Sequence, residues 1–225
     1  MGSILFSTDA FESHKARLDW VERANQSTHA LAAVLSLFAA GKLLADALPV
    51  HDQWLTIGCA VYGVSLVLVF AISALSHSFR RGRLKHGFRT LDQVAIFLVI
   101  SGMFTPVGLT ICSAWWPVLA GMWLMSLAGS VTKLFITGIR NMPTWFYVAV
   151  GWMPLLAAKP VLEQFPLAGL AWILAGGVFY TCGTYFLAND ERAPIYHPIW
   201  HVMVMAGSAC HFIVIDQFLV PLVAS

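Results

Sequence analysis

Long apolar stretches dominate the hydrophobic pattern of this chain and alternate with short polar segments. A helix needs about 20 apolar residues to cross roughly 30 Å of hydrocarbon. Seven stretches reach that length, at residues 26–48, 54–77, 91–111, 114–136, 144–163, 167–187 and 198–220. Of the 225 residues, 59% are hydrophobic and 11% are charged, which is far from the composition of a soluble domain. The pattern predicts an all-α integral membrane protein, a bundle of seven transmembrane helices.

The first 25 residues differ from the rest because they are polar and charged. They lack the apolar core of a cleavable signal peptide. We therefore expect residues 1–25 to form a short cytoplasmic amphipathic arm and residues 26–225 to form a single transmembrane domain.

The basic residues predict the orientation of the bundle, because Lys and Arg near span ends accumulate on the cytoplasmic side. Of the 13 Lys and Arg residues, only Lys42 and Lys159 fall on the side opposite the amino terminus. The amino terminus is thus predicted in the cytoplasm and the carboxyl terminus outside. This asymmetry explains the net charge of +2 better than nucleic-acid binding does.

Polar residues capable of metal binding or acid–base chemistry lie inside these apolar stretches, where they are costly. Ser73 and His77 lie in the second stretch, Asp92 opens the third, and His197 and His201 begin the seventh. Alternate helices run in opposite directions, so the end of the second stretch and the starts of the third and seventh lie on the same side of the membrane. We expect these residues to lie at a common depth near the cytoplasmic face.

The spacing of the histidines suggests a metal site. His197 and His201 are four residues apart and share one helical face, with Cβ atoms about 5–6 Å apart. With His77 they would form a three-histidine zinc site with an open position, where Asp92 could hold a water. The pair could instead be a buried hydrogen-bonding or pH-sensing pair, but a third histidine and an aspartate at matched depth favour a metal. Ser73 alone is more typical of a hydroxyl that bonds to its own helix.

Three motifs resemble the progestin and adipoQ receptor family, specifically its hemolysin III branch, which is most typical of bacteria. The motifs are Glu22, Asn25 and His29 in ERANQSTH, Ser73 and His77 in SALSH followed by Asp92 in LDQVAIF, and His197 and His201 in HPIWHVMVMAGSACHF. The resemblance implies a seven-helix protein of the bacterial inner membrane with zinc bound by His77, His197 and His201. It also implies that Asp92 holds a water and that Ser73 contacts a developing oxyanion.

The amino-terminal motif supplies further candidates. Glu22 and Asn25 could cap the first span or join a polar network with the basic second-to-third connection. His29 could support the metal ligands or, less favoured, be a fourth ligand of the zinc.

The family is also similar to the alkaline ceramidases, which implies zinc-dependent hydrolysis of a ceramide-like lipid amide in membrane lipid homeostasis. A membrane lipid is then the expected substrate or ligand. Two other functions stay open: a non-catalytic sensor or regulator of membrane state with a structural zinc, and, less favoured, a cytolytic pore or transporter. The short arm and short outer connections argue against a protein hormone as partner.

Overall fold

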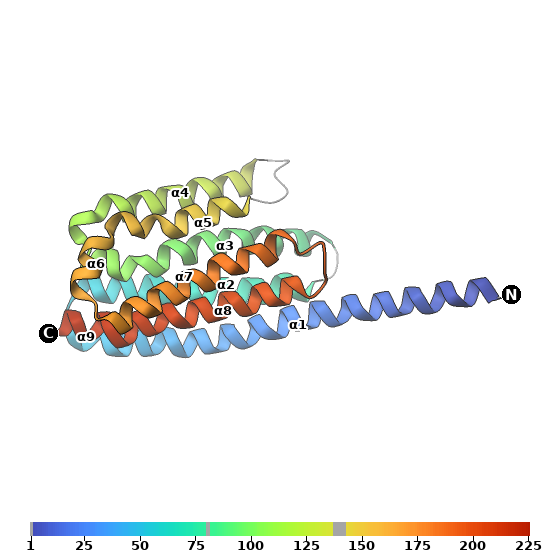
Figure 1. Ribbon diagram of the computed structural model, residues 1–225, viewed down its shortest axis with the longest axis horizontal. Coiled ribbons are helices and arrows are strands. Elements are labelled where there is room, and N and C mark those ends of the chain that lie inside the picture. The colour runs from blue at the N-terminus through green and yellow to red at the C-terminus, as the bar shows by residue number, and fades with distance from the viewer. Residues whose placement is uncertain (1, 80–81, 137–142) are drawn as a thin grey trace.

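Long helices lie side by side in a single bundle in the computed structural model, which describes residues 2–79, 82–136 and 143–225, with side chains from residue 19 onward (Figure 1). These residues contain no strand. Seven helical segments are long and apolar enough to cross a membrane: Asp19–Val50, Gln53–Ser78, Gly82–Leu109, Ser113–Phe135, Thr144–Gln164, Leu167–Ala188 and Tyr196–Ala224. The predicted fold class is confirmed, and each predicted span overlaps one of these segments.

The helices follow one another with short connections. Their bounds are α1 (Gly2–Ala47), α2 (Gln53–Ser78), α3 (Gly82–Leu109), α4 (Trp116–Phe135), α5 (Thr144–Trp152), α6 (Ala158–Gln164), α7 (Leu167–Ala188), α8 (Tyr196–Val214) and α9 (Val220–Ala224). The two termini lie at opposite ends of the bundle, as an odd number of crossings requires (Figure 1). The side of the membrane that each terminus faces stays a prediction from the basic residues.

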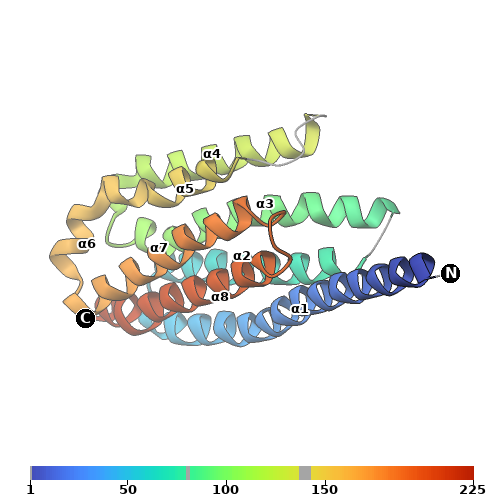
Figure 2. The ribbon, with the colours of Figure 1, turned by 45° about the vertical axis from the view of Figure 1, so that its right-hand side comes forward.

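Two helices begin earlier than the apolar pattern predicts. The predicted arm is the first part of α1, whose amino-terminal turns project beyond the other helices in both views (Figures 1 and 2). Helix α3 begins at Gly82 rather than at residue 91, so Asp92 lies about three turns inside it and not at its start. Apolar composition marks the part of a helix that contacts hydrocarbon, whereas a helix can continue through polar residues beyond it.

The fifth span is interrupted near Pro154. Helix α5 ends at Trp152, a 3-10 segment covers Met153–Ala157, and α6 begins at Ala158. Proline has no N–H and its ring clashes with the preceding turn, so a regular helix does not continue through this position.

Small residues allow α2, α3 and α4 to approach closely. A Cβ atom on Gly58 would lie 2.5 Å from the Cα atom of Pro106 in α3. Ser101 also lies in α3, and its hydroxyl is 2.8 Å from the Ser126 hydroxyl of α4. Small residues and interhelical hydrogen bonds of this kind drive helix association in membranes. The same two helices are also in contact near the end of α2, where the Ser76 hydroxyl donates to Asp92 of α3 at 3.2 Å.

We expect Gly58→Ala to destabilise the bundle by about 1–3 kcal/mol, because the added methyl group collides with the backbone at Pro106. Thermal unfolding of the purified protein in detergent measures the effect as a lower midpoint. Gly41→Ala is the matched control, since nothing lies within 4 Å of its Cβ position. Equal midpoints for the two variants would contradict the close approach of α2 and α3.

Candidate metal centre

Three histidines from two distant parts of the sequence meet at one end of the bundle. His77 lies one residue before the end of α2, and His197 and His201 lie in the first two turns of α8. One ligand atom from each lies within 4.8 Å of the other two. The ring centroids of His77 lie 5.1 Å from those of both other histidines, and the pair on α8 is separated by 4.8 Å. The structure therefore brings together the three residues that the sequence suggests as ligands.

Each of these imidazoles has an oxygen partner at Nδ1. The partner of His77 is Glu22 Oε2, at 2.7 Å. The partner of His197 is Asp190 Oδ2, at 3.0 Å, and the partner of His201 is Thr28 Oγ1, at 3.4 Å. Oxygen partners at one ring nitrogen fix the ring orientation and leave the other nitrogen for a metal. The oxygen partners thus hold all three rings, and the Nε2 atom of His77 has no partner among the described residues.

Buried polar atoms without a hydrogen-bond partner gather around this cluster. Among the described residues they include Nε2 of His77, both ring nitrogens of His29 and Oδ1 of Asn25. A buried nitrogen or oxygen without a partner costs free energy. A cation bound by the imidazoles would give His77 Nε2 its missing partner, and neutral imidazole is a preferred zinc ligand. The residues present therefore fit a zinc ion.

Glu22 links the cluster to the beginning of α3. Its Oε2 contacts His77, and its Oε1 accepts a hydrogen bond from Lys85 Nζ at 3.2 Å. The sequence suggested Glu22 for a polar network with the basic connection between the second and third spans, and the structure contains that network.

Asp92 lies beside the histidine cluster without belonging to it. Its carboxylate is close enough to His77 and His197 to interact electrostatically, but it is not among the groups whose ligand atoms lie within 4.8 Å. Ser76 Oγ donates a hydrogen bond to Asp92 Oδ2 at 3.2 Å. The buried Ser73 also interacts with this carboxylate. Two serines of α2 therefore orient a carboxylate of α3 next to the proposed ligands.

His29 packs on a proposed ligand. Its ring stacks on His201 with a centroid separation of 3.5 Å and an angle of 11° between the planes. Phe70 also contacts His29, with a centroid separation of 5.1 Å and the two ring planes nearly perpendicular. Imidazole lone pairs lie in the ring plane, so two parallel stacked rings cannot direct lone pairs at the same ion. His29 therefore supports the His201 ring and is not a further ligand of the same metal.

Two partners of the histidines were not identified from the sequence. Thr28 lies one residue before His29 in α1, and Asp190 lies in the turn between α7 and α8, seven residues before His197. The hydrogen bond from His197 holds the pKa of the Asp190 carboxyl below its ordinary value. The sequence offered one signal for Asp190, because it is an acidic residue in a short turn near the candidate ligand His197.

His211 is remote from the cluster, as its position predicts. It lies ten residues beyond His201 on α8 and stacks with Tyr180 at a centroid separation of 5.9 Å.

Comparison with known proteins gives the family. A sequence model described as "Haemolysin-III related" matches residues 20–212, a range that includes every site residue named above. This chain belongs to the haemolysin III family.

Individual relatives agree with this assignment over nearly their whole lengths. Hemolysin-3 of Bacillus cereus is 33% identical over 203 residues, which cover 89% of this chain and 92% of that protein. The Hemolysin-3 homolog of Bacillus subtilis (strain 168) is 31% identical over 194 residues, covering 85% and 91%. The monocyte to macrophage differentiation factor of Homo sapiens is 27% identical over 210 residues, covering 87% and 83%. The resemblance to the hemolysin III and progestin and adipoQ receptor proteins is confirmed.

The oxygen partners of the histidines predict a measurable effect on metal affinity in this haemolysin III protein. We expect Glu22→Ala and Asp190→Ala each to weaken zinc binding about 10–100-fold, because a ligand imidazole loses the group that orients it. Competition with a chromophoric zinc chelator on purified protein measures the change. Glu163→Ala is the control, since this carboxylate pairs with Lys159 at the other end of the bundle. Affinities equal to that of the control would contradict this role.

Proposed function

We propose that this haemolysin III protein binds zinc through His77, His197 and His201 and hydrolyses a lipid amide. The observation that carries the proposal is the joint geometry of the cluster: three ligand atoms within 4.8 Å of one another, each ring held at Nδ1, and a carboxylate alongside. Three protein ligands leave a tetrahedral zinc one open position, which is typical of catalytic rather than structural zinc sites.

The division of chemical roles follows from the residues themselves. Zinc bound by neutral imidazoles supplies Lewis-acid activation of water and of carbonyl groups. Asp92, oriented by Ser76, is placed to hold a water beside the cluster and to take its proton. The Ser73 hydroxyl, which interacts with the Asp92 carboxylate, would turn to donate to the carbonyl oxygen as negative charge develops there.

A membrane lipid is the proposed substrate because all of these groups lie on transmembrane helices. His201 and Ser73 are 1% and 2% exposed, and we expect a lipid substrate to enter between helices. The similarity to alkaline ceramidases favours a ceramide-like amide, and the proposed role is in lipid homeostasis of the bacterial inner membrane.

A regulatory function without catalysis is the second candidate, and one observation favours it. The cluster joins α2 and α8, while its oxygen partners come from α1 and from the turn between α7 and α8. A metal bound there would tie these helices together, so the zinc could be structural in a sensor of membrane state.

Asp92→Asn separates catalysis from metal binding. We expect this variant to retain zinc while its rate of lipid hydrolysis falls by about 10²–10⁴-fold, because the general base is lost. Fatty-acid release from ceramide and other N-acyl lipids is measured by mass spectrometry on protein reconstituted in nanodiscs, with Glu163→Gln as a control variant. Zinc content is measured on the same samples.

The two candidate functions give different outcomes in that experiment. Equal hydrolysis by wild type, zinc-depleted protein and Asp92→Asn would rule out the hydrolase. The regulator predicts no turnover of any lipid, together with a lower unfolding midpoint after zinc removal and in His77→Ala. His86→Ala, which changes an exposed histidine outside the cluster, is expected to leave the midpoint unchanged.

A further inference from the structure

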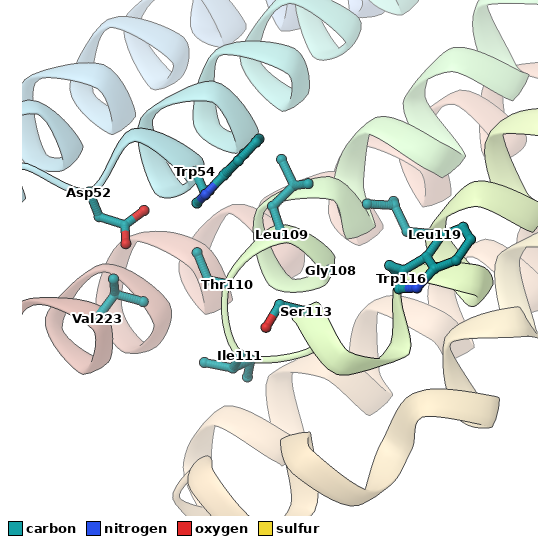
Figure 3. Close-up of a pocket in the computed structure, with 10 residues that line it drawn as sticks. All are labelled: Asp52, Trp54, Gly108, Leu109, Thr110, Ile111, Ser113, Trp116, Leu119 and Val223. Carbon is teal, nitrogen blue, oxygen red and sulfur yellow. The ribbon is translucent and has the colours of Figure 1, made fainter.

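A pocket of about 600 Å³ opens at the end of the bundle opposite the histidine cluster. It lies among the start of α2, the end of α3, the start of α4 and the end of α9 (Figure 3). Helix α2 connects the two regions: Asp52 immediately precedes it and His77 lies one residue before its end. The pocket is therefore separate from the proposed metal centre by nearly the length of a membrane-spanning helix.

The lining of this pocket is typical of the membrane–water interface. Two tryptophans, Trp54 and Trp116, are 50% and 66% exposed, and tryptophan is enriched where transmembrane helices meet the headgroups. The remaining lining includes the hydroxyl-bearing Thr110 and Ser113 and several aliphatic side chains (Figure 3). The pocket thus combines polar groups with an apolar wall, as a phospholipid headgroup and the beginning of its chains require.

Among the described residues at this end, the Asp52 carboxylate has no counter-ion. Both lysines there are already paired with carboxylates: Lys42 with Asp46 at 2.6 Å and Asp216 at 2.5 Å, and Lys159 with Glu163 at 3.9 Å. Asp52 forms no ion pair with any residue in the described part of the chain, and it lines the pocket. The pocket lining includes no Lys or Arg. Its charge therefore complements a cation and repels an anionic headgroup.

We propose that this pocket binds the headgroup of a zwitterionic phospholipid with a primary ammonium, of the phosphatidylethanolamine type. The ammonium donates a hydrogen bond to the Asp52 carboxylate, which the quaternary ammonium of a choline headgroup cannot do, and it lies against the Trp54 indole, which attracts cations to its face. The Ser113 hydroxyl donates to the phosphate, whereas the Thr110 hydroxyl already donates to the Pro106 carbonyl of its own helix at 2.7 Å, and Leu109 and Val223 contact the beginning of the acyl chains. This inference does not depend on the function proposed for the metal centre.

Asp52 also has a structural role that has to be separated from binding. Its Oδ1 accepts a hydrogen bond from the Leu55 backbone N–H at 2.7 Å and so caps the start of α2. The cap requires an acceptor oxygen but no charge, because asparagine caps helices about as well as aspartate does. Asp52→Asn therefore keeps the cap and removes the charge on which the proposal rests.

Native mass spectrometry of the purified protein with equimolar phosphatidylethanolamine, phosphatidylcholine and phosphatidylglycerol tests the proposal. We expect wild type to retain phosphatidylethanolamine roughly threefold or more over the other two lipids. Asp52→Asn should abolish that preference. Glu163→Gln, which changes a carboxylate at the same end but outside the pocket, should preserve it.

Trp54→Leu provides a second variant that does not alter the cap, and it should also reduce the retention of phosphatidylethanolamine. Three results would overturn the proposal: no lipid preference in wild type, equal retention of phosphatidylcholine, or an unchanged preference in Asp52→Asn. Stronger retention of phosphatidylglycerol would show that the pocket selects an anionic headgroup instead.

Discussion

Hydrogen bonds from three imidazole Nδ1 atoms to oxygen partners determine the arrangement of the whole histidine cluster. Within a bundle of transmembrane helices, a buried polar atom without a partner costs free energy. Glu22, Asp190 and Thr28 meet this requirement at one nitrogen of each ring, and His77 Nε2 is left without a partner in the described residues. The same contacts that stabilise the rings thus prepare the opposite nitrogens for a cation.

Helix α1 contributes more to this cluster than its place at the start of the chain suggests. It lies beside α8 in both views of the bundle (Figures 1 and 2). Its residues supply the partners of His77 and His201 and place His29 on the face of the His201 ring. A displacement of α1 would therefore change the orientation of two proposed ligands at once, which links the metal centre to the packing of the bundle.

Much of this arrangement could be predicted from the sequence. The remainder depends on how each helix is rotated about its own axis, which the sequence pattern does not specify. Apolar runs predicted the seven spans, and antiparallel succession placed His77 near His197 and His201. The start of α3 at Gly82 could not be predicted, because composition detects contact with hydrocarbon rather than helical backbone. The contact between Thr28 and His201 joins residues 173 positions apart and depends on how α1 is rotated against α8. The spacing of residues along the chain does not determine this rotation.

Anomalous X-ray scattering at the zinc absorption edge, measured on crystals of the purified protein, tests the central claim most directly. We expect one strong peak bounded by the side chains of His77, His197 and His201, with Asp92 next to it and not among its ligands. The peak should be absent from crystals of His201→Ala. A zinc-loaded protein without a peak at this position, or with a peak elsewhere, would show that these three histidines do not bind the metal.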